Sequence, residues 1–84
     1  MEEKAARFAR LLVDEIKLYN QAKVAEGRMR ADLYSRLRED IEKSRAAYNK
    51  RYGETVKNTD YFTQELLRIL ADNRRELMGA DFPG

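Results

Sequence analysis

The sequence of 84 residues contains no cysteine and no histidine, and it has one proline and four glycines. The absence of cysteine excludes disulfides, thiolate metal sites and thiol nucleophiles. The absence of histidine removes the imidazole ligand of many zinc sites, the commonest general base and the usual pH switch. Most familiar catalytic chemistry is thereby excluded, so we expect a protein that is not an enzyme and that needs no cofactor.

Long apolar runs are also missing. The longest runs, such as residues 11–13, have three residues, whereas a membrane-spanning helix needs about 20 mostly apolar residues. After Met1 come two glutamates and a lysine, which is not the basic and then apolar pattern of a secretory signal. These features predict a chain with no membrane span and a cytoplasmic location.

Charged residues are abundant, at 38% of the chain, and 17 basic against 15 acidic side chains leave a formal net charge of +2. They are unevenly distributed. Residues 1–27 carry five of each sign, residues 28–51 carry eight basic and four acidic groups, and residues 52–84 carry four basic and six acidic groups. The basic middle segment is compatible with a nucleic-acid partner, although its excess is small.

Apolar residues recur at helical spacing through most of the chain and predict an all-α fold with a single domain over residues 1–84. We expect three main helices over about 3–20 (reaching as far as 26), 30–52 and 60–71, arranged as an antiparallel bundle that self-association would complete. A short helical turn should end at Gly79, and Phe82 in the tail is expected to pack on the core. Thr59 or Asp60 is a suitable N-cap for the third helix.

The region around Gly27 leaves two alternatives open. Glycine costs roughly 1 kcal/mol in a helix interior and often ends a helix, which favours a helix that stops between Asn20 and Glu26 and is followed by a turn. The alternative is one helix that continues through Gly27 into the next, with a length far above the usual globular range.

The first helix is apolar around much of its circumference. Its main stripe is formed by residues 5, 8, 12, 16 and 19, and Leu11, Val13 and Leu18 widen it. Such a helix must be covered on more than one side, by a third helix or by a second chain. We therefore expect Leu11, Val13 and Leu18 to contact a protein partner or another copy of the chain, with a homo-oligomer about as favoured as a monomer.

The segment 45–52 combines basic and aromatic side chains. Arginine can neutralise phosphates and tyrosine can stack on bases, but Tyr48 and Tyr52 also continue the apolar stripe of the second helix. A structural role is favoured over nucleic-acid binding. We nevertheless place Tyr48, Arg51 and Tyr52 among the residues expected to contact a partner at this end of the helix.

Other constellations carry little chemistry. Lys43 and Ser44 are adjacent, and adjacent residues of a helix do not face one another, so they form no catalytic dyad. Carboxylate pairs such as Asp14-Glu15 and Glu39-Asp40 lack the histidines that complete di-metal sites in helical bundles. We predict no catalytic and no metal site.

The strings Phe8–Asn20 and Tyr61–Asn73 resemble uncharacterised helical segments at the C-terminal ends of larger bacterial proteins, some of which carry zinc-ribbon or signalling modules. The resemblance implies a module of a longer protein that serves assembly. It carries no catalytic motif and assigns no residue a role, and this chain lacks zinc-ribbon cysteines.

The sequence thus predicts a non-enzymatic protein–protein interaction or oligomerisation module of a bacterial protein. The alternative is a small nucleic-acid-binding protein that uses the basic middle helix. The sequence identifies neither the partner nor the oligomeric state.

Overall fold

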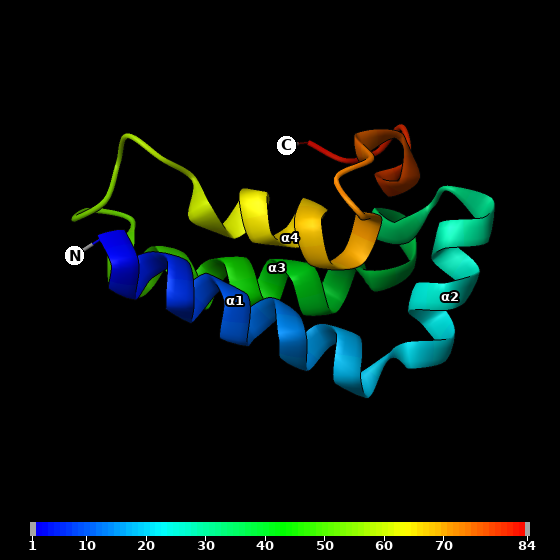
Figure 1. The fold of residues 1–84 in the computed structure, drawn as a ribbon, viewed down its shortest axis with the longest axis horizontal. Coiled ribbons are helices and arrows are strands. Elements are labelled where there is room, and N and C mark those ends of the chain that lie inside the picture. The colour runs from blue at the N-terminus through cyan, green and yellow to red at the C-terminus, as the bar shows by residue number, and fades with distance from the viewer. Residues whose placement is uncertain (1, 84) are drawn as a thin grey trace.

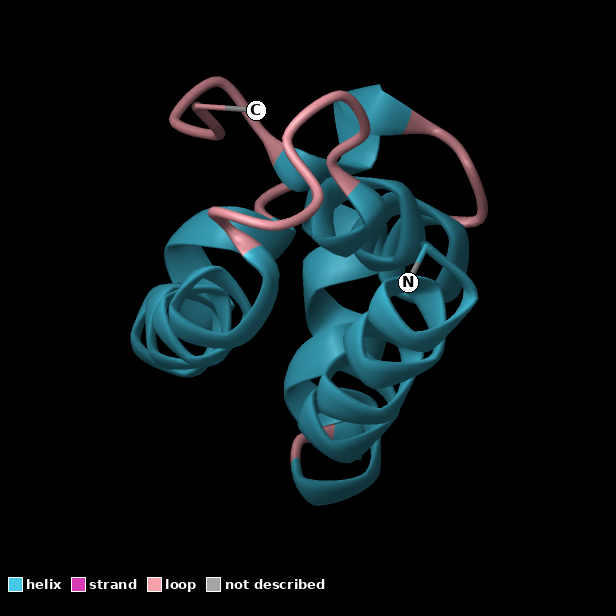
Figure 2. Cartoon of the chain, turned by 90° about the vertical axis from the view of Figure 1, so that its left-hand side faces the viewer, coloured by secondary structure: helices cyan, strands magenta, loops and turns pink. Residues whose placement is uncertain are grey.

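Four α-helices and one short 3-10 helix form the fold in a computed structural model, which describes residues 2–83. The α-helices are α1 (Glu2–Tyr19), α2 (Gln21–Arg30), α3 (Leu33–Tyr52) and α4 (Tyr61–Ala71), and the 3-10 helix covers Arg75–Met78 (Figure 1). In Figure 2 the described chain is drawn entirely as helices joined by loops. The predicted all-α fold is confirmed.

Helix α1 packs on both α3 and α4, while α2 crosses one end of these three helices and packs chiefly against α3 (Figure 1). The three helices expected to form a bundle, α1, α3 and α4, therefore lie together, and α2 is an additional helix at their end.

No helix within residues 2–83 has the length and apolar character needed to cross a bilayer.

The division between α1 and α2 differs from the sequence expectation. Helix α1 ends at Tyr19, and Asn20 leaves the helical conformation with φ −136° and ψ 36°. The chain resumes as α2, which runs through Gly27 and ends before Ala31, a residue in the left-handed region with φ 54°. The expected end of the first helix near Asn20 agrees with the structure within one residue. The turn expected after it and the alternative of one continuous helix were both wrong, because residues 21–30 form a separate helix that runs through Gly27.

The reason for a glycine at position 27 is close packing rather than helix termination. A Cβ atom there would lie 2.7 Å from Leu33 Cδ2 and 3.2 Å from Leu33 Cα. Gly27 is buried, and Leu33 is the first residue of α3. The missing side chain therefore lets α2 approach the start of α3.

Helix α3 is bent near its first third, where Leu37 has non-helical φ −113° and ψ 16°. Its first turn is braced by a bidentate pair in which the Arg36 guanidinium donates to both carboxylate oxygens of Asp32, at 3.0 and 2.9 Å. Helix α4 has the predicted bounds within one residue, and Asp60 is its N-cap, accepting a hydrogen bond of 3.1 Å from the Thr63 backbone N–H.

The core is one cluster of apolar side chains to which all four helices and the 3-10 helix contribute. Its largest fully buried members are Phe62, Leu33, Leu66, Leu70, Met78 and Val13. The C-terminal tail closes one side of this cluster, because the Phe82 ring packs at a centroid distance of 5.7 Å from Tyr34. The expected packing of Phe82 on the core is confirmed.

Candidate protein-contact surface

An open groove lies in the angle between the end of α1 and α2, and we call it the α1–α2 groove. It has a volume of about 530 Å³, within the range of about 300–1,000 Å³ typical of binding pockets. Seven residues line it: Asp14, Lys17, Leu18, Gln21, Val24, Ala25 and Arg28. Its apolar residues come from both helices, and charged side chains flank them.

The groove continues along the outer face of α1. Asp14 and Lys17 also line a neighbouring hollow that contains Leu11, together with Arg68 and Ile69 of α4. Leu11 is 54% exposed and Leu18 is 59% exposed. These two leucines are seven residues apart, which places them on the same face of α1. The outer face of α1 therefore presents two large apolar side chains that the chain itself leaves uncovered.

Helix α2 adds a protruding apolar side chain beside the groove. Met29 is 83% exposed and lies one turn beyond Ala25, which lines the groove. Ala22 is exposed on the same side of α2. Within α2, residues 22, 25 and 29 are spaced by three and four positions, so these side chains share one side of the helix. A concave surface and a protruding apolar group are therefore adjacent.

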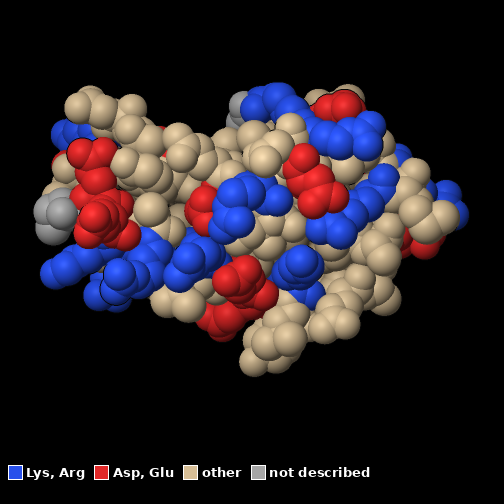
Figure 3. Space-filling model, viewed as in Figure 1, with Lys and Arg blue, Asp and Glu red and all other residues tan. Residues whose placement is uncertain are grey.

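Both signs of charge surround this surface. Asp14 and Lys17 stand on the α1 side of the groove. On α2, Glu26 and Arg30 form an exposed ion pair with 2.6 Å between Glu26 Oε1 and Arg30 Nε. Figure 3 shows basic and acidic side chains interspersed over the face that it displays, and an uncharged stretch at its lower edge over the end of α1. The charged residues around the α1–α2 groove therefore have no dominant sign of charge.

Arg28 fixes one wall of the groove to the rest of the fold. Its Nε donates to the Leu70 carbonyl at 2.8 Å and its Nη2 to the Ile69 carbonyl at 2.9 Å. These carbonyls belong to the last turn of α4, where unpaired carbonyls and the negative end of the helix dipole favour a cation. The guanidinium therefore holds α2 against α4.

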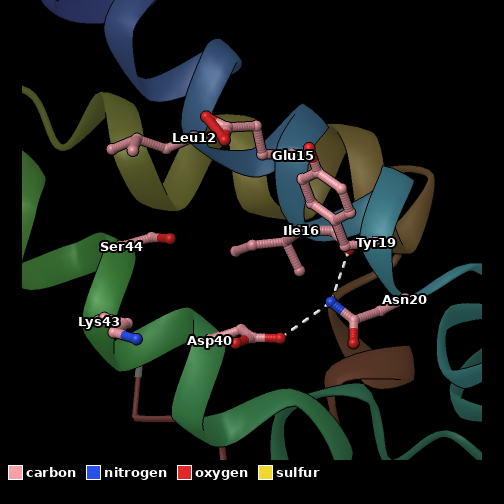
Figure 4. Close-up of a pocket in the computed structure, with 8 residues that line it drawn as sticks. All are labelled: Leu12, Glu15, Ile16, Tyr19, Asn20, Asp40, Lys43 and Ser44. Carbon is pink, nitrogen blue, oxygen red and sulfur yellow. Dashed lines mark hydrogen bonds between the residues drawn. The ribbon is translucent and has the colours of Figure 1, made fainter.

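Asn20 fixes the angle between α1 and α2 from the other side. Its Nδ2 donates to the Ile16 carbonyl at 2.8 Å and to Asp40 Oδ2 at 2.9 Å (Figure 4). Asn20 and Asp40 line a small open hollow of about 170 Å³ between α1 and α3, which Tyr19 and Lys43 also line. Asn20 and Arg28 therefore hold the two ends of α2 in place and shape the groove.

Three of the six residues predicted to contact a partner lie in the interior. Val13, Tyr48 and Tyr52 are 0%, 2% and 7% exposed. The Tyr48 ring lies 6.0 Å from the ring of Phe62, and the Tyr52 ring lies 5.8 Å from that of Phe8, measured between centroids. Burial also raises the pKa of the Tyr48 phenol. These three side chains are core residues, so their prediction as accessible contact residues is corrected.

The other three predicted residues are accessible. Leu11 and Leu18 belong to the groove and its extension, as described above. Arg51 is exposed, and its guanidinium carbon lies 5.1 Å from the centroid of the Phe8 ring and 5.8 Å from that of Tyr52. The structure thus separates the six residues into two exposed leucines of α1, an exposed arginine that packs on Phe8, and three members of the core.

Arg45, in the basic middle segment, is engaged within the chain. The Arg45 Nη1 lies 2.8 Å from Asp60 Oδ1, its Nη2 donates to the Thr63 hydroxyl, and its guanidinium covers the Phe62 ring. Burial opposes ionisation of Asp60, but hydrogen bonds from Arg45 and Thr63 outweigh it and hold the pKa of that carboxyl below its ordinary value. With Tyr48 buried as well, this segment offers little for stacking on bases.

Sequence reasoning missed the contribution of α2 to this surface. Val24, Ala25 and Met29 fell in a region expected to be a turn. The spacing of Ala22, Ala25 and Met29 was the available signal, but the expected end of the helix between Asn20 and Glu26 concealed it. Within residues 2–83 no three acidic side chains gather in a group that could hold a metal ion.

Comparison with protein-family models, with curated proteins and with solved structures finds no match for this chain.

Proposed function

We propose that this chain is a non-enzymatic protein-interaction module and that the α1–α2 groove is its contact surface. One observation carries the proposal: Leu11, Leu18 and Met29 are each more than half exposed although the fold has a continuous core elsewhere. Single exposed apolar residues are ordinary, whereas several that gather around an apolar groove are typical of interaction sites. Of the residues predicted to contact a partner, Leu11 and Leu18 line this groove and its extension.

The shape of the surface supports a helical segment as the bound element. The groove is open and lies between two helices, and the apolar side of an amphipathic helix fits such a groove through residues at spacings of three and four. On this proposal α1, α3 and α4 form the antiparallel bundle that carries the module, and α2 completes its contact surface. Charges of both signs at the rim would select the orientation of the partner helix.

Selection of peptides tests the proposal. A library of displayed amphipathic helical peptides is selected against the immobilised chain, and the affinity of enriched peptides is measured by fluorescence anisotropy. We expect peptides with apolar residues at helical spacing to bind the natural chain. The variant Leu18→Glu should lose at least about tenfold in affinity, because a charge would then have to be buried in the contact.

The matched control is Ala46→Glu, which introduces the same charge at an exposed position of α3. It should bind the peptides as the natural chain does. Circular dichroism of both variants checks that their helices are intact. Failure to enrich any peptide, or equal binding by the natural chain and Leu18→Glu, would contradict the proposal.

A further inference from the structure

We infer that a second copy of this chain occupies the α1–α2 groove, with Met29 of each copy inserted into the groove of the other. The inference rests on the proposed function and names the partner of that surface. The structure supplies both parts of the contact: a groove that Ala25 and Arg28 line and, one helical turn beyond Ala25, a methionine that is 83% exposed.

That adjacency is compatible with a two-fold symmetric dimer. In a symmetric dimer the same patch is used twice, so a residue that contacts a second residue is itself repeated on the other side of the axis. A projecting group beside a cavity satisfies this requirement, because rotation about an axis between them places each Met29 over the groove of the other copy. Methionine suits this place because its flexible thioether adapts to irregular apolar surfaces.

The charges near the contact are complementary under the same operation. Asp14 and Lys17 are three residues apart on α1, and Glu26 and Arg30 are four residues apart on α2, so each pair spans about one helical turn. When Met29 enters the opposite groove, Glu26 can face Lys17 and Arg30 can face Asp14 of the other copy. A partner with a strong charge of one sign would find no such match on this mixed rim.

The expected dimer is weak because the patch is small. A standard interface buries about 800 Å² on each partner, which would be roughly one seventh of the accessible surface of 5570 Å². The contact draws on the groove and on one face of α2, a helix of ten residues. We therefore expect a dissociation constant in the micromolar range, with dimers that separate on dilution.

Sedimentation equilibrium over concentrations from low micromolar to millimolar measures the association. The natural chain should form dimers, whereas Met29→Glu should remain monomeric over the same range because it would place a charge in an apolar groove. Met29 is exposed in the single chain, so the substitution should leave helix content unchanged by circular dichroism. A natural chain that is monomeric at millimolar concentration would overturn the inference.

Charge exchange tests the register of the contact. Lys17→Glu and Glu26→Lys should each weaken dimerisation by about two- to tenfold, and the double variant should recover most of the loss. The control exchanges Glu54 and Lys57, an exposed pair in the loop between α3 and α4, and should change nothing. If the double variant dimerises no better than the single variants, the inferred pairing is wrong.

Cross-linking gives an independent readout, because the chain contains no cysteine of its own. Chains carrying Met29→Cys are mixed with chains carrying Leu18→Cys and treated with a short thiol cross-linker. A mixed dimer should form readily, and Met29→Cys mixed with chains carrying Ala46→Cys should give far less. Equal yields from the two mixtures would contradict the inferred contact.

The inference and the proposed function fail in different ways. A chain that stays monomeric but binds selected peptides through Leu18 overturns the second copy as partner and leaves the interaction surface standing. A chain that neither dimerises nor binds peptides at the groove overturns both.

Discussion

Gly27 occupies the middle of α2, where the absence of a side chain lets Leu33 pack within 3.2 Å of the position that a Cβ atom would take. Helix propensity alone predicts that Gly27→Ala stabilises the fold by about 1 kcal/mol. We expect the opposite sign, a loss of roughly 1–3 kcal/mol in the free energy of unfolding, because the added methyl group overpacks the α2–α3 contact.

Urea denaturation measures this change. In a Leu33→Ala background, which removes the nearest side-chain atom, Gly27→Ala should cost less than it does in the natural chain. A Gly27→Ala variant that is more stable than the natural chain would contradict the packing explanation.

The lowered pKa of the Asp60 carboxyl group predicts how the free energy of unfolding changes with pH. Its pKa is held below the ordinary value in the folded chain, so its contribution to stability is complete above the unfolded pKa of about 4 and is lost as the pH falls through the folded pKa. The urea midpoint of the natural chain should therefore fall on acidification below about pH 4.

The variant Asp60→Asn keeps a capping oxygen but removes the charge that Arg45 binds. It should be less stable than the natural chain near neutral pH, and its urea midpoint should fall less over the acidic range. Parallel curves for the two proteins would contradict this role for the carboxylate.

At the scale of the residue, helical geometry contained more information than the prediction used. Leu11 and Val13 are two positions apart, or about 200° around a helix, so they could not belong to one contact face. The structure buries Val13 and exposes Leu11. Leu18, seven positions after Leu11, shares its face. Tyr48 and Tyr52 likewise continue the stripe of Ile41 and are buried with it.

At the scale of the element, α4 was predictable because its signals are local. Asp60 caps its start, a strong apolar stripe runs through it, and its expected bounds differ from the observed ones by one residue. The α1–α2 elbow was not predictable in the same way. Asn20 is held by Asp40, 20 residues away, and Gly27 is explained by Leu33 of another helix. Such contacts are tertiary and produce no periodic pattern in the sequence.

The attachment of α2 to α4 depends on the forked geometry of one side chain. Arg28 donates through two nitrogens to the carbonyls of Ile69 and Leu70, and lysine cannot reproduce both bonds. Arg28→Lys should lower the free energy of unfolding by about 1–2 kcal/mol. The control Arg7→Lys, at an exposed position of α1, should leave the urea midpoint within error. Equal stabilities for the two variants would argue against this attachment.

At the scale of the whole molecule, the fold separates a buried core from an uncovered apolar face. The excess of apolar residues on the first helix predicted that something beyond one neighbouring helix covers α1. Helices α3 and α4 cover its inner face, and the groove with Leu11 and Leu18 is what they leave open. The sequence could indicate that excess but not its location, because the location depends on the elbow at Asn20.

On our proposal, the α1–α2 groove is the surface through which this chain binds other proteins. Amide NMR spectra of the isotope-labelled chain, recorded while a selected helical peptide is added, test it most directly. We predict that the largest shifts fall on Leu18, Gln21 and Ala25. Largest shifts at the Tyr48–Tyr52 end of α3, with the groove amides unchanged, would contradict the account.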